Sequence, residues 1–347
     1  MRRYLKPTII LAVLGLMFGA LYRYLFDRAD EADLPHYVAS SLHAMGIALS
    51  GWGVHLYFTS RHSAWIRRWP LVVELIIRSV AIALVVATVT VALEAVLFHH
   101  GVNHHWLVSD YPFILAIAFG ASILIGAIYE LVRLVGGRVL IKVILGHYRR
   151  PTREERVLLF LDLVGSTTLA ERMGELRVQD LLTRFFFDID DAIVAHGGEV
   201  HAYVGDEVIV TWLIGKKPQR SYIDCFFAIE DRIAELADAY KSEFGVVPQF
   251  RGGIHAGPVV ISQCGDSRRQ VAYFGDTVNV AARLQAHCKE AGRRLLVSGE
   301  LLQLLPTESD LLVEPLGPTE LRGRSTPVEV FGVARLPTAS PGKVQVR

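Results

Sequence analysis

The sequence has few cysteines and no strong net charge. Only three of its 347 residues are cysteine (Cys225, Cys264 and Cys288), and their spacing does not match that of zinc ligands. An odd number of cysteines without such spacing fits reduced thiols, and we assign them no chemistry. The formal net charge is +1, so no overall field attracts nucleic acid. A disulfide-rich scaffold, a cysteine zinc site and a nucleic-acid partner are therefore not predicted.

Charged residues are scarce before residue 136, where long apolar runs dominate. Hydrophobic residues make up 52% of the chain, which is high for a soluble enzyme. Four of the runs reach the roughly 20 residues that a helix needs to cross a bilayer. We predict an all-α transmembrane domain over residues 1–135, with four helices at about 8–26, 38–59, 71–98 and 112–135.

Basic residues flank these predicted helices on one side of the membrane. They lie before the first helix, between the second and third, and after the fourth: Arg2, Arg3, Lys6, Arg61, Arg67, Arg68, Arg138, Lys142, Arg149 and Arg150. Of the other two connections, one is acidic and the other has four histidines without lysine or arginine. The positive-inside rule then predicts a multi-pass protein of the inner or plasma membrane, with both ends in the cytoplasm.

Several ionisable residues fall inside the predicted helices. His43, His55 and Glu94 are candidates for function, because ionisable groups are costly to bury in lipid. For the histidines, the alternatives are haem or metal ligation and hydrogen bonding between helices. Glu74 and Arg78 are four residues apart, a spacing that predicts a pair along one helix face.

The histidine-rich connection is a second candidate site on the membrane side. Imidazoles at the spacing of His99, His100, His104 and His105 can converge on zinc or copper. The alternative is a plain solvated loop. A metal or a small-molecule signal is accordingly a candidate partner of the membrane domain.

Residues 136–153 form a predicted coupling segment, with a short amphipathic helix that begins after Gly136 and Gly137 and ends at Pro151. From Val157 onward, strands alternate with helices, the latter over residues 175–198, 221–244 and 275–292. The order strand, helix, strand, strand, helix, strand predicts an α+β domain of the ferredoxin-like (βαββαβ) class, with helices on one face of an antiparallel sheet. We place it at residues 154–335 and expect a disordered tail at 336–347.

Two aspartates lie at the ends of these predicted strands. Asp162 ends the apolar strand "VLLFLDL", and Asp206 lies in a tight turn with Gly205 between the next two strands. If the strands are neighbours, the carboxylates form a pair of hard oxygen ligands that suits Mg²⁺ or Mn²⁺. Residues Gly165, Ser166 and Thr167 enter a helix, whose N-terminal amides can hold an anion. Taken singly, each aspartate also fits an ordinary capping or turn role.

Three motifs together carry a family resemblance. "FLDLVGSTTLAER", "YVGDEVIVTW" and "YFGDTVNVAARL" resemble, in this order, the catalytic domain of class III nucleotidyl cyclases, and "LRGRSTPVEVFGV" looks like its closing strands. The resemblance covers about residues 154–334. It implies that Asp162, Asp206 and the backbone carbonyl of Leu163 bind two Mg²⁺ or Mn²⁺ ions.

The resemblance also implies roles for residues farther along the chain. Asn279 and Arg283 match the pair that orients the ribose and stabilises the transition-state phosphate. Arg324 matches a residue that grips the terminal phosphates, and Arg268 or Arg269 is a candidate assistant. In this family the site forms between two chains, so a homodimer is expected, with the aspartates from one chain and the Asn-Arg pair from the other.

One departure concerns the purine base. The family's base-reading lysine is replaced by Ala202, with His201 beside it, and its usual Asp or Thr partner is replaced by Ala272. We still expect ATP as substrate, and hence a membrane-integral adenylyl cyclase. The alternatives are a guanylyl cyclase and a degenerate, nucleotide-binding switch. A diguanylate cyclase has no counterpart of "GDTVNVAARL", and a transporter would leave the cytoplasmic motifs unexplained.

Overall fold

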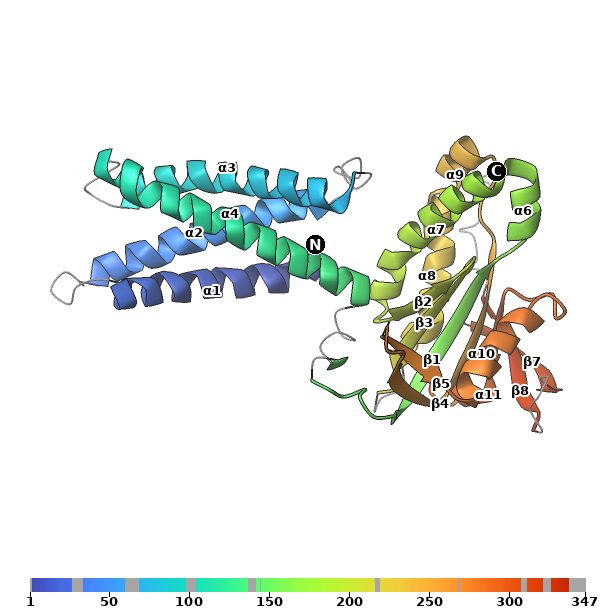
Figure 1. Cartoon of the computed structure of the whole chain (residues 1–347). Coiled ribbons are helices and arrows are strands. Elements are labelled where there is room, and N and C mark those ends of the chain that lie inside the picture. Colours follow the sequence, from blue (N-terminus) through green and yellow to red (C-terminus); the bar gives the residue numbers. More distant parts are fainter. Residues whose placement is uncertain are drawn as a thin grey trace, which may run out of the picture. The chain divides into compact units, whose positions relative to one another are not determined.

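A computed structural model of the chain describes residues 2–26, 34–59, 69–97, 104–136, 142–143, 145–215, 219–267, 269–306, 311–320 and 326–336. The chain divides into two compact units, Met1–Val135 and Gly136–Arg347. Figure 1 shows helices alone in the first unit and a sheet with helices in the second.

The described part of the first unit forms helices α1 (Arg2–Phe26), α2 (Leu34–Thr59), α3 (Leu71–Leu97) and α4 (His104–Val135). Each helix packs against the next one along the chain. Among the described residues, three stretches are long and apolar enough to cross a membrane: Pro7–Leu25, Leu71–Leu97 and Leu107–Val132. The predicted second span forms α2 but is not among them, and α2 contains His36, His43 and His55.

The ionisable residues of this unit contact one another between helices. His43 Nδ1 lies 3.7 Å from Glu94 Oε2, which joins α2 to α3. The His55 ring stacks on Trp52 and meets the edge of Tyr129. The His43–Glu94 and His55–Tyr129 contacts join helices, whereas Trp52 lies on the same helix as His55. None of the three is a hydrogen bond, so both alternatives for the histidines stay predictions.

Arg78 makes a different ion pair from the one expected. Its Nη1 lies 3.8 Å from Glu130 Oε1 on α4, rather than next to Glu74 on its own helix, and the arginine is buried. Pairing across the helix interface is favoured here because the arginine faces α4, where its guanidinium lies against Gly126.

The histidine-rich connection falls largely outside the described residues. His99 and His100 are not described, nor is the side chain of His105, while His104 begins α4 and is exposed. The predicted metal site therefore stays a prediction.

The coupling segment belongs to the second unit and is anchored to the sheet. Residues 138–141 and 144 of its predicted amphipathic helix lie outside the described residues, whereas residues 145–150 are described and form turns instead of a helix. Gly146 in this stretch has φ 75°, a conformation that interrupts a helix. Lys142 Nζ and Tyr148 Oη both donate to Glu154 Oε1, at 2.9 Å and 3.1 Å. Arg156, which is 3% exposed, donates to the other oxygen of Glu154 from Nε at 2.9 Å. One carboxylate thus joins the segment to the first strand.

The second unit is built on an eight-stranded sheet. Its strands are β1 (Thr152–Leu163), β2 (Glu199–Val204), β3 (Glu207–Leu213), β4 (Phe250–Cys264), β5 (Gln270–Phe274), β6 (Leu295–Ser298), β7 (Leu311–Thr319) and β8 (Val328–Arg335). They lie in the order β2-β3-β1-β4-β6-β8-β7, and β5 pairs with β4 beyond the β6 contact. The pairs β2–β3, β3–β1 and β1–β4 are antiparallel, whereas β4 and β6 are parallel, so the sheet is mixed rather than antiparallel throughout.

The helices of this unit are α6 (Ser166–Met173), α7 (Glu175–Ala195), α8 (Ser221–Glu235), α9 (Ala237–Phe244), α10 (Asp276–His287) and α11 (Gly299–Leu302). The helix predicted over 221–244 is two helices, because Leu236 leaves the helical conformation at ψ 7°. The helix predicted over residues 175–198 is confirmed as α7.

Helices cover both faces of the sheet, which corrects the predicted one-sided arrangement. Leu159 and Leu161 of β1 belong to a core with α7 and α8, whereas Leu158 and Phe160 pack on the other side, toward α10. Burial on both faces explains why β1 reads as a continuous apolar run. On the α10 side, Gly253 permits backbone contact, since a Cβ there would overlap the backbone nitrogen of Gln285.

Candidate active site

Two predicted metal-binding aspartates converge at the end of β1. Asp162 pairs in the ladder with Glu207, the first residue of β3, and the turn that carries Gly205 and Asp206 immediately precedes it. Because β1 and β3 are antiparallel neighbours, the end of one strand lies beside the start of the other. The carboxylates of Asp162 and Asp206 are close enough to interact through a hydrogen bond.

The electrostatics of this end of the sheet are dominated by uncompensated negative charge. Burial, and then the charge of Asp206, raise the pKa of Asp162 to about 6. Burial and the charges of both aspartates raise the pKa of Glu207 to about 7. Within the described part of the chain, no basic side chain is among the groups that set these two pKa values. The cluster therefore favours a cation or a proton.

Glu207 and Gln285 belong to this cluster but are absent from the sequence prediction. Gln285 Nε2 donates to Asp162 Oδ2 at 3.2 Å, and the Leu163 amide also donates to this carboxylate. Glu207 directly follows Asp206, which is a local signal. For Gln285 the sequence offers none, because its contact depends on how α10 packs on β4.

The donor set fits a divalent cation. Two carboxylates and the main-chain carbonyl of Leu163 are the oxygen ligands that Mg²⁺ and Mn²⁺ prefer, with remaining positions open to water or phosphate. Over the described ranges, no group of three or more His, Cys, Asp or Glu side chains could hold a metal. The arrangement is thus an open pair of acidic ligands and not a closed protein cage.

The predicted phosphate-binding turn follows β1 directly. Gly165 is the N-cap of α6 and has φ 75°, a left-handed conformation that favours glycine. Ser166 and Thr167 form the first turn of α6, where backbone amides lack helical partners. The side chain of Leu163 is buried in the core and holds the start of this turn in place.

Asn279 and Arg283 lie on α10, four residues apart on one helix face. Asn279 is exposed and Arg283 is half-buried, whereas Gln285 is 9% exposed. At 3.6 residues per turn, Arg283 and Gln285 are separated by about 200° around the helix. Since Gln285 faces Asp162 of its own chain, the Asn-Arg pair points away from these carboxylates.

The predicted base-recognition residues meet in one place. His201 occupies a bulge of β2, between Val200 and Ala202, and its ring stacks on Tyr273 with centroids 3.9 Å apart. Ala272 precedes this tyrosine on β5. Burial, with a smaller effect from the nearby Arg156, lowers the pKa of His201, so the ring is neutral at neutral pH.

Two of the predicted arginines, Arg268 and Arg324, lie outside the described residues. Arg269 is described and exposed. Their predicted contacts with phosphate stay predictions.

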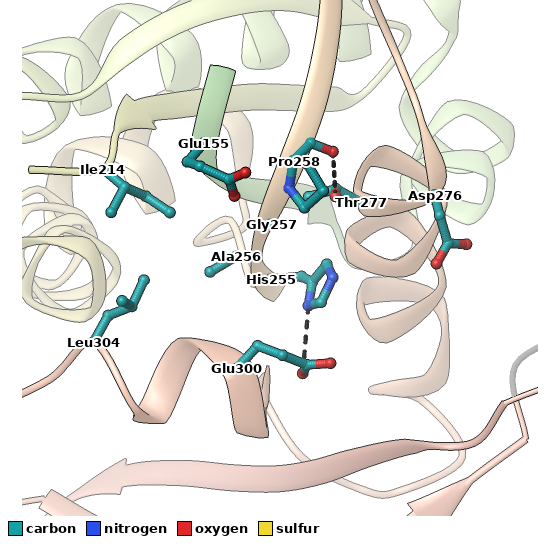
Figure 2. A pocket seen from close by; sticks show the side chains of 10 residues that line it. All are labelled: Glu155, Ile214, His255, Ala256, Gly257, Pro258, Asp276, Thr277, Glu300 and Leu304. Carbon is teal, nitrogen blue, oxygen red and sulfur yellow. Dashed lines mark hydrogen bonds and ion pairs between the residues drawn. The ribbon is translucent and has the colours of Figure 1, made fainter. Parts of the chain in front are cut away.

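A cavity of about 410 Å³ lies away from the carboxylates, and none of the predicted site residues lines it (Figure 2). It is found beside β4, next to Glu155 near the start of β1. His255 Nδ1 is 2.7 Å from Ser298 Oγ and 3.9 Å from Glu300 Oε2, and Thr277 Oγ1 donates to the Pro258 carbonyl. This cavity is therefore separate from the candidate active site.

Comparison with known proteins bears on this geometry. The family model "Adenylate and Guanylate cyclase catalytic domain" matches residues 150–334. Adenylate cyclase 2 of Rhizobium meliloti (strain 1021) is 37% identical over 201 residues, which are 58% of this chain and 55% of that protein. Guanylyl cyclase C of Sus scrofa is 30% identical over 50% of this chain and 16% of its own length. A structure of a bacterial light-regulated adenylyl cyclase superposes with a TM-score of 0.54 at 22% identity, over 66% of this chain and 67% of that one, which shows a shared fold.

Proposed function

Because this chain belongs to the adenylate and guanylate cyclase catalytic-domain family, we propose that it converts ATP to 3′,5′-cyclic AMP and pyrophosphate. The observation that carries the proposal is the convergence of Asp162 and Asp206 at adjoining strand ends. Asp162, Asp206 and the Leu163 carbonyl would hold divalent cations there, which would supply acidification of the ribose 3′-hydroxyl and neutralisation of charge on the departing pyrophosphate. No nucleophile from the protein is needed.

The remaining chemistry falls to positioned side chains and amides. The amides of Gly165, Ser166 and Thr167 hold phosphate oxygens at the start of α6, and Arg324 grips the terminal phosphates. Asn279 orients the ribose. The Arg283 guanidinium meets charge that grows on the α-phosphate in the transition state, where a preorganised donor is most effective.

We propose that the active site is shared between two copies of the chain. Asn279 and Arg283 point away from the aspartates of their own chain, so they are available to the aspartates of a partner. Val204 and Phe274, 57% and 49% exposed, directly precede the turn with Asp206 and the turn into α10. Exposed apolar side chains beside both halves of the site support a surface that a second copy covers.

The membrane part of the proposal rests on the apolar helices. We propose that α1 to α4 all cross the bilayer, with the N-terminus and the catalytic domain in the cytoplasm. The antiparallel order β2-β3-β1-β4 supports a ferredoxin-like core for the catalytic domain. Regulation is proposed to act by changing the relative placement of two catalytic domains, which the coupling segment transmits.

Adenine is the proposed base, on the strength of the relatives named adenylate cyclase. Ala202 stands where the family has its base-reading lysine, so the stacked His201 and Tyr273 are the proposed contacts. A guanylyl cyclase is the second candidate, since guanylyl cyclase C also matches. The third is a nucleotide-binding switch without activity, to which Ala202 and Ala272 point.

The test is an assay of the purified full chain with Mn²⁺ and either ATP or GTP. Cyclic AMP as the main product is expected. Cyclic GMP as the sole product would favour the guanylyl alternative, and no cyclic product from either nucleotide would remove the enzyme proposal. Mixing Asp162→Ala with Arg283→Ala, each nearly inactive alone, should restore activity because one of the two shared sites is then intact. Failure to complement, with dimers verified, would contradict the two-chain site.

A further inference from the structure

The contact between Gln285 and Asp162 has no counterpart in the sequence motifs. Gln285 lies on α10, is 9% exposed, and its Nε2 is 3.2 Å from Asp162 Oδ2. Its position is narrowly determined, because the backbone of α10 at Gln285 rests directly on Gly253 of β4. An ionised carboxylate only accepts hydrogen bonds, so the amide must present its nitrogen to Asp162.

We propose that Gln285 is a positioning residue for the metal-binding carboxylate of its own chain. The inference rests on the proposed function, since it assumes that Asp162 binds a cation. A hydrogen bond to Oδ2 fixes the rotation of the carboxylate and leaves Oδ1 directed to a cation. Groups that hydrogen-bond to metal ligands in this way typically contribute 10- to 100-fold to metal affinity.

An amide suits this task better than a basic side chain would. A lysine or arginine at the same place would cancel the charge of Asp162 and compete with the cation. The neutral amide orients the carboxylate and leaves the negative charge of the cluster in place. This charge, shared among Asp162, Asp206 and Glu207, is what attracts the cation.

The assignment gives α10 two tasks on its two sides. Gln285 holds the aspartate of its own chain, and Arg283, about 200° away around the helix, is offered to the partner's site. Each α10 therefore takes part in both active sites of the proposed dimer. A shift of this one helix would change metal binding in one site and transition-state stabilisation in the other.

The first test measures binding of Mn²⁺ alone, without nucleotide, by the electron paramagnetic resonance signal of the free ion. Gln285→Met keeps the length of the side chain and removes the donor, and should weaken binding by about 10- to 100-fold. Gln179→Met, at an exposed glutamine of α7, is the matched control and should bind as wild type. If Gln285→Met binds Mn²⁺ with wild-type affinity while Asp162→Asn does not bind it, the role of Gln285 is overturned and the proposed metal site is kept. Equal binding by wild type and Asp162→Asn would instead count against the proposed metal site.

The second test separates positioning from general damage to α10. A Gln285→Met chain mixed with an Arg283→Ala chain should be as active as the Asp162→Ala and Arg283→Ala mixture, because the working site combines an intact aspartate pair with the Arg283 of the Gln285→Met chain. The same chain mixed with Asp162→Ala should be about 10- to 100-fold less active at limiting Mn²⁺, and saturating Mn²⁺ should recover part of the loss. Loss in both mixtures would mean that the substitution displaces α10, and would overturn the inference.

Discussion

The two ends of β1 carry carboxylates in opposite electrostatic surroundings. At the start of the strand, Glu154 accepts hydrogen bonds from Lys142, Tyr148 and Arg156. Burial opposes its ionisation, but the two basic partners outweigh burial and lower the pKa of Glu154. At the end of the strand, burial and Asp206 raise the pKa of Asp162 to about 6. Strand β1 therefore has a carboxylate balanced by basic side chains at its start, and a carboxylate without such partners among its pKa-setting neighbours at its end.

The difference separates structural from functional charge. A half-buried carboxylate with basic partners is already satisfied and contributes to holding the coupling segment on the sheet. Carboxylates that repel one another in a half-buried site cost stability, and such strain is typical of sites that bind a cation.

The largest effect is expected from Asp162→Asn. Losing a ligand of the proposed cation should lower cyclase activity by at least about 10²-fold, as removal of an electrostatic stabiliser typically does. Stability without metal should not fall, because one member of a repelling cluster is neutralised. Product formation and urea unfolding in EDTA would be measured, with the exposed Asp180→Asn of α7 as control. If Asp162→Asn is less stable than wild type but normally active, Asp162 has a structural role like that of Glu154, and the difference between the two ends of β1 is contradicted.

Glu154→Gln should act in the reverse way. Removing one partner of a buried ion pair costs about 3 kcal/mol, here because the charge of the buried Arg156 is left without its closest carboxylate. Cyclase activity per folded molecule of the purified chain should be unchanged. The neighbouring Glu155→Gln is the control, and its exposed pair with Arg153 should contribute less than about 1 kcal/mol. Equal effects of the two variants on urea unfolding would contradict the buried-pair argument.

Gly253→Ala tests whether backbone contact with α10 holds the functional end together. The added methyl group meets the Gln285 backbone and should cost about 1–3 kcal/mol, with loss of activity as α10 moves. Gly332→Ala of β8 is the control, since the nearest contacts of its Cβ would be atoms of the flexible Arg293 side chain, at 3.3 Å. The measurements are the unfolding free energies and the cyclase activities of the two variants, and a larger loss in Gly253→Ala is expected. A harmless Gly253→Ala would show that α10 tolerates displacement.

The smallest effect concerns pH. Asp162 and Glu207 have folded-state pKa values of about 6 and about 7, above their ordinary 3.8 and 4.5, so the folded chain holds their protons more tightly than the unfolded chain does. Their contribution to stability is present at low pH and is lost as pH rises through about 6 to 7. Glu154, with a lowered pKa, contributes above pH 4.5 and loses its contribution as pH falls.

The measurement is the unfolding midpoint in EDTA between about pH 5 and about pH 8. Asp162→Asn should reduce the fall of the midpoint over this range by about 2–4 °C, which corresponds to about 1 kcal/mol. Glu154→Gln should leave that fall unchanged. An unchanged profile in Asp162→Asn would contradict the unfavourable interaction between the two aspartates.

Local patterns predicted much of the catalytic unit. The apolar run before Asp162, the Gly205-Asp206 turn and the amphipathic helix over α7 depend on neighbouring residues, and these elements appear in the structure as expected. The break at Leu236 was missed because nothing in its composition interrupts the helical pattern. Strand β5 and the parallel pairing of β4 with β6 depend on distant residues, which sequence periodicity does not register.

The candidate site divides in the same way. Sequence patterns predict the two aspartates because Asp162 lies at the end of a strand and Asp206 lies in the turn between two strands. Their closeness follows from the pairing of β1 with β3. Gln285 was missed because only tertiary packing brings it to Asp162. The pairing of Arg78 with Glu130 rather than Glu74 has the same cause, since the orientation of one helix face toward another cannot be read from one helix alone.

The three cysteines differ in burial, so a thiol-reactive label can be directed to one of them. Cys225 and Cys288 are fully buried, and burial raises the pKa of each to about 12, so neither reacts readily with maleimides. Cys264, half-buried at the end of β4 beside β5, is the remaining cysteine of the sequence. A fluorophore attached to the unmodified protein would therefore sit at one known position, and could report on the catalytic unit without any substitution.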